Sequence, residues 1–184
     1  MSSFVLCGVK TVVRVTQNVI VALVLIVLIS GVGKASVFVD PTSSYSVKIP
    51  NNWVYQAYES DRLLTVFYGE GNPNLLYFEQ FIQIPDDTAL NFAERTLDLY
   101  AGAGGLKEFL FNGDFKHIEV HGQPGVLCVY TYKGNSGKDL WEERIFFRFS
   151  EKHAFSITFG GEGKWEERDE DVLKDVLTDW RWLF

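Results

Sequence analysis

Cysteine is scarce in this sequence: Cys7 and Cys128 are the only two among its 184 residues. Cys7 precedes a long apolar run and has no small residue directly before it, which argues against a lipid-attached cysteine. If the N-terminal leader is removed, Cys128 is the sole thiol, and an intramolecular disulfide is then excluded. We interpret Cys128, which lies inside an apolar stretch, as a small buried core residue.

Basic residues are also in deficit, with 17 Lys and Arg against 24 Asp and Glu. The charge is divided unevenly, because residues 1–36 hold three basic residues and no acidic one, which leaves residues 37–184 at −10. A nucleic-acid-binding domain needs a basic face to meet phosphates, so that class of function is excluded. The apolar fraction of 47% likewise excludes wholesale disorder.

The recognised catalytic and phosphate-binding patterns are missing. Residues 134–138 are too short for a phosphate-binding loop, and the glycine cluster at 102–105 follows an expected helix instead of opening one. No Gly-x-Ser-x-Gly element occurs. The acidic stretch at 166–171 lacks the alternating pattern and central glycine of a calcium loop. The sequence therefore predicts no cofactor and no enzymatic activity.

The N-terminal segment indicates export. An uncharged 15-residue run, Val19 to Gly33, follows the cations Lys10 and Arg14. This order is typical of a signal peptide, and a cut before Ser36 would follow small residues. An uncleaved membrane anchor stays open, although a spanning helix usually needs about 20 apolar residues. In both cases residues 1–36 serve export or anchoring, and residues 37–184 form a domain outside the cytoplasm, in the periplasm or an equivalent compartment.

Hydrophobic periodicity in residues 37–184 predicts strands interrupted by one helix and closed by another. Alternation of apolar and polar residues favours strands at 37–40, 45–49, 63–68, 75–84, 115–120, 125–132, 141–149 and 155–159. Helical spacing favours a helix beginning near Asp87 or Thr88, and a second one in the acidic C-terminal stretch up to Trp180. Hairpin-linked strands make an antiparallel sheet that the two helices must cover. The fold class is therefore an α+β sandwich.

The order of these elements, and several residues at their ends, resemble the PsbP-like superfamily. That group includes the PsbP protein of photosystem II, the envelope lipoprotein DcrB and a nuclear-import factor that binds the GTPase Ran. The resemblance covers about residues 37–184 and depends on Tyr45–Pro50, Trp53, Ile118, Gly122, Pro124–Gly125, the strand Val126–Tyr132, Arg144–Phe147, Phe155–Phe159 and the C-terminal helix. It implies an α–β–α sandwich around an antiparallel sheet, and a role in binding or assembly without a reaction.

Two sets of residues are candidates for sites. His117, Glu119 and His121 alternate on one predicted strand, so they could share a surface and act as ligands for zinc or a similar ion. A single ion would require a bulge or turn near His121, because the two histidines of a straight strand lie about 13 Å apart. An exposed strand face is the alternative. The aromatic content also leaves Trp53, Tyr55 and Tyr58 as candidates for a partner-binding groove, although core packing explains most aromatic residues.

These observations lead to three hypotheses about function. The first is a non-enzymatic, extracytoplasmic domain that binds or helps to assemble a protein partner, with the membrane contacted through the segment 19–33. The second is a carrier that holds a small apolar ligand in a closed, aromatic-lined cavity. The third is a metal-dependent enzyme that uses His117, Glu119 and His121, which requires the three side chains to converge.

Overall fold

Three long strands form the centre of an eight-stranded antiparallel sheet in the computed structural model, which describes residues 36–82, 84–85 and 87–184. The described residues belong to one unit, Ala35–Phe184. The strand order is β3-β4-β5-β10-β9-β8-β6, and β7 also pairs with β8. The strands are β3 Trp53–Tyr55, β4 Leu64–Gly69, β5 Leu75–Phe81, β6 Lys107–Phe111, β7 Lys116–Val120, β8 Gln123–Lys133, β9 Asp139–Ser150 and β10 His153–Glu162.

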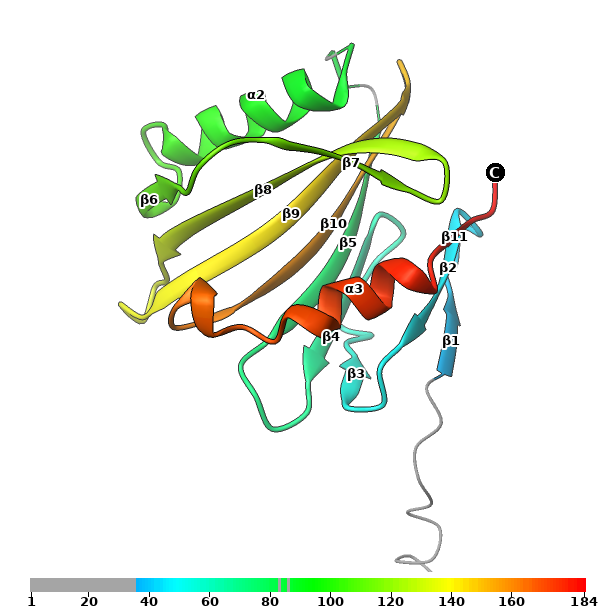
Figure 1. Cartoon of the computed structure of the whole chain (residues 1–184), viewed down its shortest axis with the longest axis horizontal. Coiled ribbons are helices and arrows are strands. Elements are labelled where there is room, and N and C mark those ends of the chain that lie inside the picture. Colours follow the sequence, from blue (N-terminus) through cyan, green and yellow to red (C-terminus); the bar gives the residue numbers. More distant parts are fainter. Residues whose placement is uncertain (1–35, 83, 86) are drawn as a thin grey trace, which may run out of the picture. The chain divides into compact units, whose positions relative to one another are not determined.

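Helix α2, Ala89–Ala101, covers one face of this sheet (Figure 1). It begins where the sequence predicts, because the Thr88 hydroxyl accepts a hydrogen bond of 3.0 Å from the backbone N–H of Asn91. Its buried residues pack on β8 and β9 in a core that includes Phe92, Ala93, Leu97, Val126, Cys128, Tyr130 and Phe146. Cys128 is a core residue, as predicted, and burial raises the pKa of its thiol to about 12.

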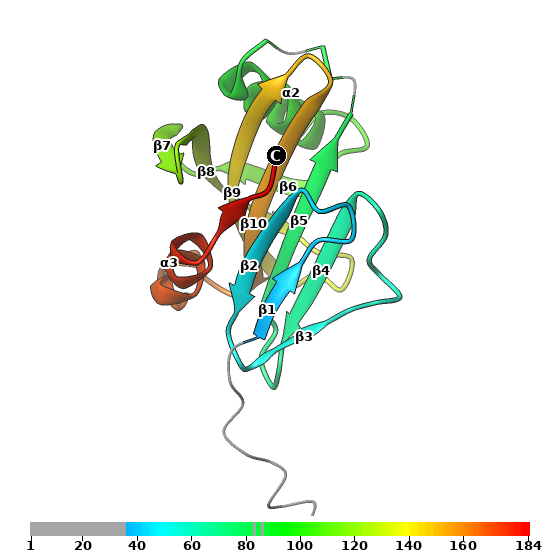
Figure 2. The same ribbon diagram turned by 90° about the vertical axis from the view of Figure 1, so that its right-hand side faces the viewer.

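The opposite face of the sheet is covered by two elements. One is α3, Glu170–Thr178, which follows a short 3-10 turn at Trp165–Glu167. The other is a second, three-stranded antiparallel sheet of β1 Ser36–Val39, β2 Tyr45–Ile49 and β11 Arg181–Trp182 (Figures 1 and 2). The α+β class, the antiparallel pairing and the two helices are confirmed. The single sheet expected from hairpin connections is wrong, because the first strands form this separate layer.

Alternation along β2 explains the separate layer. Tyr45, Val47 and Ile49 are buried, whereas Lys48 is exposed, so β2 lays an apolar face on the main sheet. Trp180, which follows α3, stacks on the Tyr45 ring at 4.5 Å between centroids and holds the small sheet and the C-terminal segment in one core. No helix among the described residues is long and apolar enough to cross a membrane. The predicted leader comprises residues 1–36, and its residues 1–35 lie outside the described part of the chain.

Candidate binding groove beside the C-terminal helix

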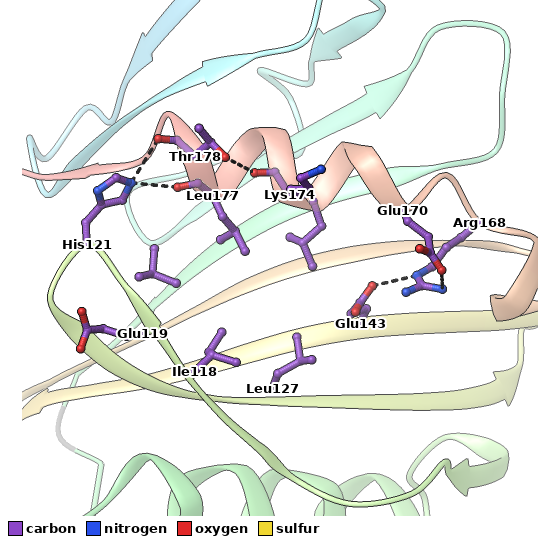
Figure 3. Close-up of a pocket in the computed structure, with 12 residues that line it drawn as sticks. Ile118, Glu119, His121, Leu127, Glu143, Arg168, Glu170, Lys174, Leu177 and Thr178 are labelled. Carbon is purple, nitrogen blue, oxygen red and sulfur yellow. Dashed lines mark hydrogen bonds and ion pairs between the residues drawn. The ribbon is translucent and has the colours of Figure 1, made fainter.

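A groove of about 530 Å³ lies between the β7–β8 hairpin and α3 (Figure 3). Its apolar lining comes from both elements, with the side chains of Ile118, Val120, Leu127, Leu173 and Leu177. Val120 and Leu173 are buried, while the other three are only partly buried. Polar groups form the rim, including Glu119, Glu170, Lys174 and Thr178. An apolar floor with a polar rim is the usual composition of a binding site.

The hairpin that forms one wall has a tight turn of two residues. Val120 pairs with Gln123, so only His121 and Gly122 connect the two strands. Both have positive φ angles, 48° and 82°, as a type I′ turn requires. Gly122 adopts this conformation without steric cost, whereas His121 is a less common residue there. The turn therefore fixes the register that places Ile118 and Val120 on the groove side of β7.

His121 closes one end of the groove by reaching α3. Its Nε2 lies 2.9 Å from the carbonyl oxygen of Leu177 and 3.2 Å from that of Thr178 (Figure 3). Both carbonyls belong to the last turn of the helix, where carbonyl groups have no intrahelical partner. A carbonyl only accepts, so the histidine nitrogen acts as the donor. The Arg181 guanidinium lies beside the ring, with Nη1 at 3.2 Å from Nε2.

An ion pair lies at the other end of the groove. Arg168 Nε donates to Glu143 Oε2 at 2.9 Å, and both side chains are only 11% exposed. Arg168 also lies over the Trp165 ring at 4.1 Å from its centroid. Because Glu143 belongs to β9, this pair attaches the segment before α3 to the main sheet. The groove is therefore held at both ends by specific polar contacts.

We expect His121→Ala to lower the free energy of unfolding by about 1 kcal/mol, because a hydrogen bond between the hairpin and the helix is lost. Urea denaturation followed by tryptophan fluorescence measures the change. His117→Ala is the matched control, because His117 is exposed on β7, the strand that leads into this turn, and is expected to change stability by less than about 0.5 kcal/mol. Equal effects of the two substitutions would contradict a stabilising hydrogen bond between His121 and α3.

The candidate metal ligands occupy different settings. His117 and Glu119 are exposed on β7, and Glu119 lies on the rim of the groove. His121 is in the turn, with one ring nitrogen directed at helix carbonyls. In the part of the chain that the structure describes, no group of three His, Cys, Asp or Glu side chains could hold a metal ion. The metal-site prediction gains no support from this arrangement.

The three candidate aromatic residues also separate. Trp53 is buried and meets the Phe159 ring edge-on at 6.1 Å. Tyr55 is 40% exposed and packs on Phe38, while Tyr58 is fully exposed. Among these three predicted partner-binding residues, only the two tyrosines offer ring surface to a partner, and they lie outside the lining of the groove beside α3.

A buried polar network that the sequence did not predict lies beneath α2. The Glu142 carboxylate on β9 accepts hydrogen bonds from Tyr77 at 2.7 Å, from Tyr132 at 2.8 Å and from Tyr130. Burial raises the pKa of Tyr77 and Tyr130 well above the ordinary range, so both hydroxyls keep the protons that they donate. The network holds strands β5, β8 and β9 together through one carboxylate.

Arg144 supplies the positive charge of this network. Its side chain is only 2% exposed and forms an ion pair with Glu79 on β5. It also donates to the Tyr100 hydroxyl on α2 at 2.7 Å and to Ser156 Oγ on β10 at 2.9 Å. Glu142 and Arg144, two residues apart and directly before the apolar run Ile145–Phe147, are the sequence signal that could have revealed it.

This chain is similar to known proteins in structure. No protein-family model and no curated protein sequence matches the chain. The Ran-binding protein Mog1p of Saccharomyces cerevisiae has a TM-score of 0.60 and 6% identity, and the alignment covers 83% of this chain and 97% of that one. Cyanobacterial PsbP (CyanoP) of Synechocystis sp. PCC 6803 has a TM-score of 0.57 and 14% identity, with 83% and 95% covered.

A third similar structure, from Bacteroides thetaiotaomicron VPI-5482, has a TM-score of 0.56 and 10% identity over 80% of this chain. This chain spans about half of that protein, with 48% covered. Likeness at such low identity is evidence of the fold alone. The matches to Mog1p and CyanoP, each over 83% of this chain, show that its eight-stranded sheet, with α2 on one face and α3 and the small sheet on the other, is a PsbP-like fold.

Proposed function

We propose that residues 37–184 form a non-enzymatic binding domain outside the cytoplasm, and that the groove beside α3 holds an apolar segment of a protein partner. The observation that carries this proposal is the groove itself, which combines an apolar floor with a polar rim. Its volume of about 530 Å³ falls in the usual range of about 300–1,000 Å³ for binding pockets.

The energetics favour an apolar segment. Ile118, Leu127 and Leu177 remain partly exposed, so a partner that covers them gains from burying their surface as well as its own. Each large apolar side chain that a partner buries fully contributes about 1.5–3 kcal/mol. The elongated floor runs along α3, an arrangement that suits an amphipathic helix lying beside it.

The setting and the comparisons support the same proposal. Mog1p is a Ran-binding protein, so at least one protein with this fold acts by binding a protein. The uncharged run from Val19 to Gly33 supports export or membrane anchoring of the domain. The partner would then be another protein at the outer side of the same membrane.

A small-ligand carrier is the second candidate function. A hollow of about 400 Å³ at one end of the main sheet is lined by residues that include Tyr68, Tyr132, Trp141, Glu142 and Glu162. It opens to solvent, whereas the carrier expected from the sequence requires a closed, aromatic-lined cavity. The groove beside α3 has the larger volume, and its aliphatic side chains come from two facing elements, the β7–β8 hairpin and α3, and we therefore favour the protein partner.

Site-specific crosslinking tests the protein-partner proposal. A benzophenone amino acid placed at Glu119 or at Lys174 in the full chain, on opposite rims of the groove, is expected to form the same adduct in native membranes. The same probe at Leu99, which is 62% exposed on α2, is the matched control and should not form it. Adducts that are identical at all three positions, or absent from both rim positions, would contradict the proposal.

A floor substitution then tests the groove directly. Leu127→Asp is expected to reduce both rim adducts at least tenfold, because a carboxylate replaces apolar contact at the base of the groove. Its unfolding midpoint is measured in parallel, and the milder Ile118→Thr, expected to weaken both adducts several-fold, replaces it if the domain is unfolded. Rim adducts that persist at full yield in a folded floor variant would exclude the groove as the binding site.

A further inference from the structure

The outer face of the small sheet differs in chemistry from the rest of the domain. It faces the viewer in Figure 2, with the three strands in the order β1-β2-β11. Val37 pairs with Lys48, Val39 pairs with Ser46, and Ser46 pairs with Arg181, so these five side chains point away from the core. Their neighbours along each strand, including Tyr45, Val47 and Trp182, point inward.

This face is apolar and cationic. Val37 is 69% exposed and Val39 is 53% exposed, although both occupy a regular strand. Leu183 continues the outward alternation after Arg181, because its N–H bonds to the carbonyl of Ser44, and it is 48% exposed. Isolated exposed aliphatic residues are common, but three of them on one small face together with cations are less so.

The charge of the face is opposite to that of the domain. Lys48 projects from it and lies 3.6 Å from Asp179 at its edge, while the Arg181 guanidinium turns along the edge toward His121 and the carbonyl oxygen of Trp180. Without Lys48 and Arg181, residues 37–184 hold 12 basic and 24 acidic residues, a net charge of −12. Aliphatic side chains beside lysine and arginine suit the boundary between lipid headgroups and acyl chains.

The position of β1 in the sequence also points to the membrane surface. The uncharged run ends at Gly33 and β1 begins at Ser36. Three residues of extended chain reach at most about 11 Å. If the run from Val19 to Gly33 is retained in a bilayer, the first residue of β1 must therefore lie close to the headgroups.

We propose that the outer face of the β1-β2-β11 sheet lies on the membrane surface, with Val37, Val39 and Leu183 at the level of the headgroups and Lys48 on anionic lipids, while Arg181 adds positive charge at the edge of the face. This inference rests on the anchoring part of the proposed function and is independent of what the groove binds. Three aliphatic side chains and two cations bind a bilayer weakly by themselves. The covalent anchor makes the contact intramolecular and so raises the effective concentration of lipid at this face.

Quenching by brominated lipid tests the proposal on the full chain. The fluorophore bimane is attached at Val39→Cys in a Cys7→Ser background, while the buried Cys128 stays unlabelled in the folded protein. The chain is reconstituted in vesicles of phosphatidylcholine with 30% phosphatidylglycerol and brominated acyl chains. We expect at least twofold stronger quenching at position 39 than at the matched control Leu99→Cys, which is similarly exposed on α2.

A charge and apolar variant completes the test. Val37→Asp combined with Lys48→Gln is expected to lower the quenching at position 39 to the level of position 99, while the chain still sediments with the vesicles. Equal quenching at positions 39 and 99 in a sedimenting chain would overturn the proposed orientation alone. A chain that does not sediment with vesicles would overturn the anchoring as well. A blue-shifted emission at position 39 without bromolipid quenching would indicate protein on this face, and would also overturn the proposal.

Discussion

Replacing Arg144 by methionine is expected to lower the free energy of unfolding by about 3 kcal/mol, because it removes a buried cation from the buried Glu142 network and from the partly exposed Glu79. The side chain is 2% exposed and ion-paired with Glu79. Arg144 Nη1 also donates to the Tyr77 hydroxyl at 3.3 Å, and that hydroxyl in turn donates to Glu142. Typical domains have only about 5–15 kcal/mol in total, so the loss is a large fraction of stability. Urea denaturation followed by fluorescence and circular dichroism measures it.

Two further variants separate the network from a general effect of losing an arginine. Arg62→Met changes an exposed arginine and is expected to shift stability by less than about 0.5 kcal/mol. Arg144→Met combined with Glu79→Met is expected to recover part of the loss, because both members of the buried pair are then replaced by apolar groups. An Arg144→Met variant as stable as Arg62→Met would show that the network does not contribute to the stability of the folded domain.

The network shows what a sequence can and cannot reveal about a buried site. Glu142 and Arg144 lie two residues apart on one strand, so their common face follows from the alternation of β-structure. Their partners do not follow in the same way. Tyr77 lies 65 residues before Glu142, and the contact arises because β5 and β9 are both neighbours of β10. No local pattern encodes that strand order.

The same distinction applies to the fold. Strong local signals predicted β2 from the alternation of Tyr45, Val47 and Ile49, and predicted the start of α2 from Thr88. The sequence did not predict β3, β6 or β11, which are 3, 5 and 2 residues long. Strands this short exist because a neighbouring strand supplies hydrogen bonds. The separate small sheet was missed because its last strand follows α3, far along the chain from β2.

The groove could be predicted only in part. The hairpin turn near His121 follows from Gly122 and Pro124, and the apolar side of β7 follows from Ile118 and Val120. The contact of His121 with the Leu177 carbonyl, 56 residues away, depends on where α3 lies on the sheet. The sequence therefore predicts a histidine in the turn, but its position at the end of the groove depends on the packing of α3.

Replacing Trp180 by alanine is expected to lower the free energy of unfolding by about 3–5 kcal/mol, the usual range for removing a buried tryptophan. Its side chain is fully buried between the two sheets. The ring stacks on Tyr45 and meets Phe78 and Phe155 edge-on at 5.1 and 5.6 Å between centroids. The cavity left by alanine would lie between the two sheets and would therefore weaken the packing of the small sheet on the main sheet. Urea denaturation measures the loss, and hydrogen exchange in β2 is expected to accelerate more than exchange in β8.

Trp180→Phe distinguishes the volume of the ring from its polar group. The indole Nε1 of Trp180 is buried and has no hydrogen-bond partner among the residues that the structure describes. An unsatisfied buried donor costs about 1–3 kcal/mol. Phenylalanine removes this donor, but its smaller ring also makes fewer contacts with the surrounding aromatic residues. We expect the two effects nearly to cancel, with a change within about 1 kcal/mol. Tyr58→Ala, which removes a fully exposed ring, is the control and should leave stability unchanged. A Trp180→Phe variant as unstable as Trp180→Ala would mean that the indole nitrogen is satisfied in solution, and that this residue contributes more than packing.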